Sequence, residues 1–274
     1  MIFKKYKSIL LAAIFVFVLL ALRTNSTRAR NINQLQNHKI EEIRSRIVFL
    51  ITEDPDNYEA HITVPPFAEM LRDKYGYEVT VLLGSGGRGS YRYPHMEIIS
   101  KADLLIVFAR RIALPHEQVN IIKKYLREGK PLIGIRTANH AFTAHDKVVE
   151  GFEDWPEFVA DILGCENRGY GPANPGTDVS VVPEEIDHPI LKDFYPKQWH
   201  SDGNLYIVSP LLDKKANILV TGKVNELIEP IAWTRTAEKS KIFYTSLGYP
   251  TDFQNTQFIT LLVNAIKWTL LEGK

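Results

Sequence analysis

From Arg46 onward, short apolar runs alternate with segments whose apolar residues recur at helical spacing. Four of the runs have the length and composition of strands, and the first is a compact apolar run consistent with a strand buried on both faces. They are RIVFLIT (46–52), EVTVLL (78–83), DLLIVFA (103–109) and PLIGIR (131–136). Residues 63–75 and 115–128 lie between successive runs, and each segment places its apolar residues on one face of a helix. A glycine follows each of these helices, at Gly76 and Gly129, as a C-terminal stop.

The second half of the chain has a different pattern. A short helix over 155–163 precedes Gly164, and a longer helix over 256–271 closes the chain. Between the two helices are short runs with β character: 177–182, 204–208, 217–224, 230–234 and 241–246. Alternating strands and helices predict parallel pairing through right-handed crossovers. We therefore predict one α/β domain over residues 46–274, a three-layer flavodoxin-like, mostly parallel sheet with extra β structure in its second half.

The N-terminal segment has the pattern of a targeting signal. Ile9–Leu22 is unbroken apolar sequence, and three lysines precede it. A basic region followed by about 7–15 apolar residues is typical of secretory signals, whereas a bilayer span needs about 20. We expect residues 1–22 to be a signal peptide or an N-terminal membrane anchor, and residues 23–45 to be a linker. The body is then exported to the periplasm or another extracytoplasmic space.

Composition and charge limit the kinds of molecule that the protein is expected to bind. With 45% hydrophobic and 24% charged residues, the chain is ordinary globular protein. Residues 1–30 hold six basic and no acidic side chains, which leaves 27 basic against 32 acidic residues in the body. An acidic body argues against nucleic-acid binding, and we expect membrane contact only through the N-terminal segment. The single cysteine, Cys165, excludes an intrachain disulfide and a cysteine-rich zinc site.

The cofactor motifs in the chain are incomplete. Residues 84–89 (GSGGRG) match the spacing of a dinucleotide fingerprint, but no helix start and no Walker lysine follow them. We interpret them as a surface loop or lid. His116 and Glu117 lack the second histidine of a zinc helix, and His140 and His145 are separated by predicted loop. We expect no cofactor and no metal site.

The segment PLIGIRTANH (131–140) is the strongest local signal for a site. A buried strand runs directly into a tight polar turn, and in open α/β sheets ligands bind at the carboxyl ends of such strands. Arg136 begins the turn, and its forked guanidinium suits an anionic or hydroxyl oxygen of a ligand. A structural ion pair of Arg136 with an acidic loop residue is the alternative that the sequence leaves open.

Several blocks of the chain, taken in order, resemble the trehalose-utilisation (ThuA-like) family of the class I glutamine-amidotransferase-like superfamily. They are PLIGIRTANHAF (131–142), WPEFVADILG (155–164), DHPILKDF (187–194), SDGNLYIV (201–208), EPIAWTRT (229–236) and KIFYTSLGYPTDFQN (241–255). The resemblance covers the chain from about Arg46 to the C-terminus. It implies the flavodoxin-like sheet of that superfamily, with a site around the turn after the fourth strand.

The resemblance also implies a function and a departure from the superfamily's chemistry. True amidotransferases carry a cysteine in the turn where this chain reads Gly134-Ile135-Arg136, and an arginine cannot attack an amide, so we expect no glutaminase activity. ThuA-like proteins often have histidines at this turn and after the following helix, where this chain has Arg136 and Arg168. We expect the protein to bind or act on a small-molecule carbohydrate, such as an oxidised or keto-disaccharide. The alternatives are a catalytically inactive binding or scaffold module near a membrane and a hydrolase of unknown substrate; homo-oligomerisation stays open.

Strand ends and later turns supply the candidate site residues. We expect Arg136 to bind a substrate oxygen and His140 or His200 to act as general acid/base, because the pKa of histidine lies near neutrality. The expected substrate-binding residues are Glu53, Tyr58, Arg110, Trp199, Asp202, Tyr249 and Asp252.

Overall fold

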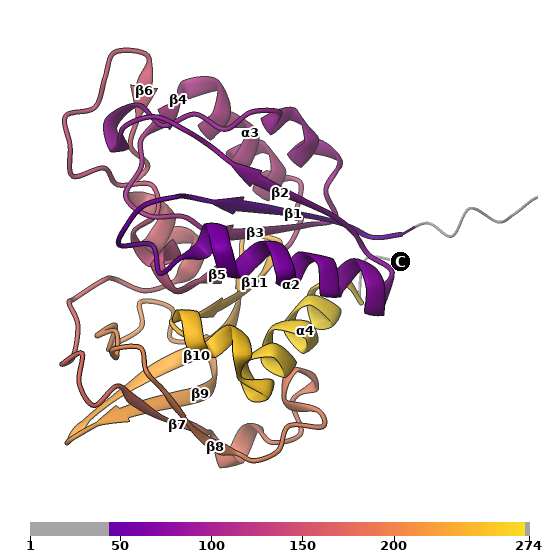
Figure 1. The fold of residues 1–274 in the computed structure, drawn as a ribbon, viewed down its shortest axis with the longest axis vertical. Helices are drawn as coiled ribbons and strands as arrows, with labels where there is room; N and C mark the ends of the chain where they lie inside the picture. Colours follow the sequence, from indigo (N-terminus) through magenta and orange to yellow (C-terminus); the bar gives the residue numbers. More distant parts are fainter. Residues whose placement is uncertain (1–43, 272–274) are drawn as a thin grey trace, which may run out of the picture. The chain divides into compact units, whose positions relative to one another are not determined.

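The computed structural model describes residues 44–271, and a nine-stranded sheet runs through this part of the chain (Figure 1). Its parallel strands, in spatial order, are β2 (Glu78–Leu83), β1 (Arg46–Ile51), β3 (Leu104–Phe108), β5 (Leu132–Ile135) and β11 (Ser240–Thr245). The sheet continues through the antiparallel strands β10 (Leu227–Ala237), β9 (Asn217–Val224), β7 (Thr177–Val181) and β8 (Gln198–Ser201). The predicted α/β class, with its flavodoxin-like sheet and extra β structure from the second half, is confirmed.

Strand β1 explains why the central runs are apolar at every position. Ile47, Phe49 and Ile51 belong to one hydrophobic core, whereas Val48 and Leu50 belong to the core on the opposite face of the sheet. Successive side chains of a strand point to opposite faces, so a strand covered on both sides has no polar face.

Helices cover both faces of the sheet. The helices α2 (Ala60–Tyr75) and α4 (Thr256–Leu270) share the first core. The opposite core contains α3 (His116–Arg127), the 3-10 helix η2 (Met96–Lys101) and η4 (Phe158–Leu163), which is a π-helix. Figure 1 shows α2 and α4 on the same side of the strands, and α3 packs on the other side. The three-layer arrangement leaves the carboxyl ends of the parallel strands and their loops as the place for a site.

The second half differs from the prediction in three details. Residues 204–208 are not a strand of the sheet and contribute only an isolated bridge between Tyr206 and Tyr170. Strand β8 has no matching prediction, since three of its four residues are at least partly exposed. The helix expected over 155–163 is the π-helix η4.

None of the helices within residues 44–271 is long and apolar enough to cross a membrane. The expected signal or anchor over residues 1–22 lies outside the described residues, as does nearly all of the expected linker.

Candidate functional site

The turn after β5 is a strained elbow at the carboxyl edge of the sheet. Strand β5 lies between β3 and β11, and the 3-10 helix η3 (Arg136–His140) follows it directly. Arg136 has φ 44°, a left-handed conformation that is uncommon for a residue other than glycine. Its carbonyl accepts a hydrogen bond of 2.8 Å from the Tyr244 hydroxyl. Strain of this kind persists where surrounding contacts fix the backbone, and it is concentrated at functional sites.

The Arg136 side chain lies inside the protein rather than in a cleft. It is 1% exposed, and its guanidinium carbon lies 4.0 Å from the centre of the Tyr58 ring, 4.8 Å from Tyr206 and 5.7 Å from Tyr249. The guanidinium donates hydrogen bonds to the Ser246 carbonyl at 2.7 Å and to Asn204 Oδ1 at 2.8 Å. These contacts favour a structural role for Arg136, which is the alternative that the sequence left open. The partners of its guanidinium are aromatic rings and the oxygens of neutral groups rather than an acidic residue.

His140, at the end of η3, lies between two amides. Its Nδ1 lies 2.5 Å from Asn139 Oδ1 and 3.0 Å from Asn167 Nδ2. In the tautomer that donates from Nδ1 to Asn139 Oδ1, the lone pair lies on Nε2 and Asn167 Nδ2 makes no hydrogen bond to the ring. Burial, followed by the charges of Arg111 and Arg110, holds the pKa of His140 well below its usual value. The imidazole is therefore neutral near pH 7 and can accept a proton through Nε2.

A cavity of about 610 Å³ lies beside the elbow, within the range of roughly 300–1,000 Å³ of small-molecule sites. One wall is the π-helix η4, and such irregular helices occur frequently at functional sites. Polar and aromatic groups make up much of the remaining lining: Arg111, Asn139, His140, Thr143, Glu166, Asn167 and Tyr170.

Cys165 also lines this cavity but is unsuited to nucleophilic attack. Its side chain is buried, and burial raises the pKa of the thiol to about 12. A thiol that remains protonated near neutrality is a poor nucleophile. The Cys165 thiol is therefore protonated near neutrality, and the elbow position itself holds Arg136 rather than a cysteine.

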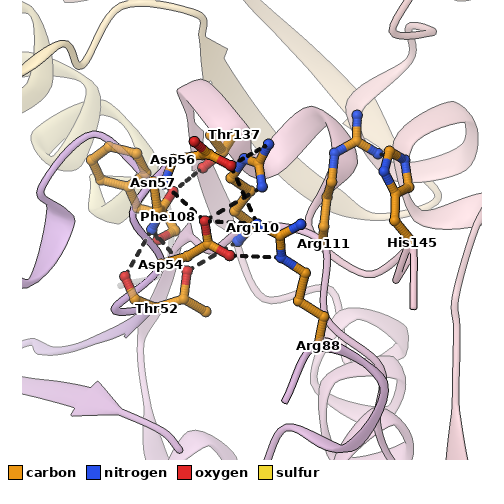
Figure 2. Close-up of polar contacts among 10 residues, drawn as sticks. All are labelled: Thr52, Asp54, Asp56, Asn57, Arg88, Phe108, Arg110, Arg111, Thr137 and His145. Atoms are coloured by element: carbon orange, nitrogen blue, oxygen red, sulfur yellow. Dashed lines mark hydrogen bonds and ion pairs between the residues drawn. The ribbon is translucent and has the colours of Figure 1, made fainter. Parts of the chain in front are cut away.

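A second polar cluster lies at the ends of β1 and β3 (Figure 2). Asp54 accepts hydrogen bonds from Arg88 at 2.8 Å and from Arg110 at 3.4 Å, and both arginines also pair with Asp56 at 3.3 Å. Burial raises the pKa of Asp54, but hydrogen bonds from Arg88 and the Asp56 backbone outweigh it and lower the pKa overall. Arg110 is thus engaged with carboxylates, and Arg88 ties the glycine-rich loop 84–89 to the sheet edge.

Some of the other predicted residues surround the elbow and others lie farther from it, and none of them lines the cavity. Tyr58 and Tyr249 enclose Arg136, and Asp252 accepts the backbone N–H groups of Gly248 and Tyr249 at 2.8 Å each. Of the more peripheral ones, Glu53 is exposed near His61, Trp199 packs against Phe194, Asp202 accepts a hydrogen bond from Thr251, and His200 pairs with Asp178. His140 is the only predicted site residue that lines the cavity.

Sequence reasoning missed Arg111, Asn139 and Asn167. Arg110 and Arg111 both follow the strand β3, and successive residues there point in different directions, so only one of the pair can face the cavity. The two asparagines carry no spacing signal, because residues 139 and 167 are brought together only by the fold.

No cluster of three or more His, Cys, Asp or Glu side chains suited to a metal ion occurs within residues 44–271. The donors at the cavity are amides, an imidazole and a guanidinium, which suit polar organic groups better than a cation.

Comparisons with known proteins agree with this architecture. The chain superposes with a ThuA-like protein of Bacteroides uniformis (TM-score 0.62, 19% identity, 84% of this chain and 93% of that chain). A ThuA-like protein of Parabacteroides merdae is similar (TM-score 0.61, 17% identity, 84% and 91%). At these identities the structural matches establish the fold. No curated protein matches the sequence. The sequence profile described as trehalose utilisation matches residues 48–269, and the chain therefore belongs to the ThuA family.

Proposed function

We propose that this protein binds or acts on a carbohydrate in the cavity beside the elbow, without glutaminase activity. The observation that carries the proposal is the lining of that cavity. Asn139, Asn167 and His140 offer hydrogen-bond donors and acceptors to hydroxyl groups, and the Tyr170 ring supplies an apolar face. The Tyr170 and His140 rings meet edge to face, with their centres 6.4 Å apart. A few converging polar groups beside an aromatic surface are what a sugar site requires.

His140 is the group best placed for chemistry on the bound sugar. Its neutral state near pH 7 and the lone pair on Nε2 allow it to take a proton from a hydroxyl group or from a carbon next to a carbonyl. An oxidised or keto-sugar would offer such an acidic proton. His200, the other expected acid/base, is exposed and paired with Asp178, which supports a surface ion pair instead.

A binding module without catalysis is the second candidate. Within residues 44–271, no carboxylate pairs with His140, whose partners are the amides of Asn139 and Asn167. An imidazole without an acidic partner gains less stabilisation when it accepts a proton, which weakens it as a base.

Titration calorimetry of the full chain against mono- and disaccharides in neutral, keto, acid and phosphorylated forms tests the proposal. We expect saturable binding of at least one sugar and a loss of about fivefold or more in affinity for His140→Asn, as removal of one ligand hydrogen bond predicts. His116→Asn is the matched control, because His116 pairs with Glu153 and lies outside the cavity lining.

Turnover of the bound sugar separates an enzyme from a binding module. Absence of binding by every sugar, or release of glutamate from glutamine, would overturn the proposal.

We also propose that residues 1–22 direct the protein out of the cytoplasm, on the basis of their basic and apolar pattern. A fusion of residues 1–30 to a reporter that is active only outside the cytoplasm should be active. A silent reporter would contradict export.

A further inference from the structure

Arg111 occupies a special position in the cavity wall. It lies between β3 and the elbow in a left-handed conformation, with φ 50°. Its N–H donates to the His140 carbonyl at 3.1 Å, and the next N–H, of Ile112, donates to the Ala141 carbonyl at 2.7 Å. The backbone of Arg111 is therefore fixed against the end of η3, and its side chain lines the same cavity as His140.

The charge of Arg111 is not neutralised by a carboxylate. Among the side chains of residues 44–271, none of the acidic groups lies within 4.0 Å of its guanidinium, whereas Arg88 and Arg110 both pair with Asp54 and Asp56. Figure 2 shows the contrast: Arg88 and Arg110 reach toward the aspartates, whereas Arg111 lies beside His145, to whose Nε2 its Nη1 donates a hydrogen bond.

The neighbouring groups do not neutralise the charge of Arg111. The charge of Arg111 lowers the pKa of His145, which opposes protonation of that ring, and Asp146 offsets this effect only in part. Glu166 is the one carboxylate in the cavity lining, and it pairs with Arg168 at 2.7 Å.

Two buried donors of the cavity lining have no acceptor. Arg111 Nε and Asn139 Nδ2 are inaccessible to solvent, and neither makes a hydrogen bond within the described part of the chain. Buried donors are nearly always satisfied in folded proteins, so these two N–H groups are exceptional among the polar atoms of the lining residues.

Resting on the proposed function, we infer that the carbohydrate ligand carries an anionic group, a carboxylate or a phosphate, that Arg111 binds. The guanidinium fork matches the geometry of both groups. His140, which lines the same cavity, then lies beside the sugar ring.

The test compares matched sugars by titration calorimetry on the full chain: glucose with glucuronate and glucose 6-phosphate, and the corresponding galactose series. We expect at least one anionic form to bind about tenfold or more tightly than its neutral parent, the range for charge-assisted hydrogen bonds. Preference for the uronate identifies a sugar acid, and preference for the 6-phosphate identifies a phosphate ester.

Arg111→Asn is the decisive variant. Asparagine tolerates positive φ better than arginine, so this substitution removes the charge while suiting the backbone, and the melting temperature should not fall. We expect the preference for the anionic sugar to fall to within about threefold of the neutral sugar, while Arg127→Gln, an exposed arginine outside the cavity, keeps it. Equal binding of neutral and anionic sugars, or a preference that survives Arg111→Asn, would overturn this inference alone. Absence of binding by every sugar would overturn the proposed function as well.

Discussion

The guanidinium of Arg136 stacks over the ring of Tyr58, with 4.0 Å between the guanidinium carbon and the ring centre. Arg136 begins the elbow after β5, and Tyr58 lies in the turn between β1 and α2. Hydrogen bonds from the same guanidinium reach Ser246 and Asn204, so a single side chain ties together loops from three parts of the chain. In this protein the elbow residue holds the site together, while His140, at the other end of η3, faces the cavity.

Replacing Arg136 with lysine should therefore cost stability more than ligand binding. Lysine keeps the charge but cannot donate to Ser246 and Asn204 together while stacking on Tyr58. We expect a loss of about 2–4 kcal/mol in the free energy of unfolding and a fall in melting temperature of roughly 5–10 °C. Sugar affinity should change by less than about threefold. Arg92→Lys, at an exposed arginine, is the control. A marked loss of affinity at unchanged melting temperature would restore Arg136 as a substrate-binding residue.

Gly203 should be intolerant of a side chain because it lies against the same guanidinium. A methyl group at this position would lie 2.9 Å from Arg136 Nη1 and 3.0 Å from Tyr249 Cβ. Overpacking of this kind costs about 1–3 kcal/mol, so Gly203→Ala should unfold at a lower denaturant concentration. At Gly87 the nearest atom would be Ser90 Oγ at 3.7 Å, and Gly87→Ala should stay within about 0.5 kcal/mol. Similar stability for the two variants would mean that the space between Gly203 and the Arg136 guanidinium can hold a methyl group.

The Cys165 thiol should be inert in the folded protein. With a pKa of about 12, only about one thiol in 10⁵ is ionised at pH 7, and the side chain is buried. A chromogenic disulfide reagent should modify Cys165 slowly under native conditions and rapidly in denaturant. Rapid reaction of the folded chain would show an accessible thiolate and reopen the question of a cysteine nucleophile.

Acidification should destabilise the protein through His140. Its pKa is lowered in the folded state, so below about pH 6.5 the unfolded chain binds more protons than the folded one. The contribution of His140 is complete above that pH and is lost as the pH falls. Between pH 7.5 and 5.5 the wild type should lose about 1 kcal/mol more stability than His140→Asn. Other histidines are common to both proteins and cancel in the difference. Parallel pH profiles would contradict the buried, neutral state of His140.

The fold could be predicted from the sequence because its signals are local. The strand β2 has the predicted bounds 78–83, and Val119, Ile122 and Leu126 form the buried face of α3, as their spacing predicts. The prediction failed where burial does not reflect strand pairing: β8 is largely exposed although it is a strand, and Leu205, Tyr206 and Val208 are buried although they lie in a loop.

The candidate site could be predicted only in its location. The strand-to-turn pattern of residues 131–140 correctly places the elbow at a carboxyl strand end. The backbone angles of Arg111 and Arg136 determine which side chains face the cavity. Asn167 reaches the cavity from a distant segment of the chain. None of these features leaves a periodic signal in the sequence, whereas the strand-to-turn pattern points directly to Arg136.

A crystal structure of the protein with the tightest-binding sugar of the calorimetric panel tests the central claim most directly. We expect the sugar in the cavity beside the elbow, with an oxygen within hydrogen-bond distance of His140 Nε2 and with Arg136 still enclosed by Tyr58, Tyr206 and Tyr249. A sugar bound elsewhere on the protein, or one that contacts the Arg136 guanidinium and leaves His140 untouched, would contradict it.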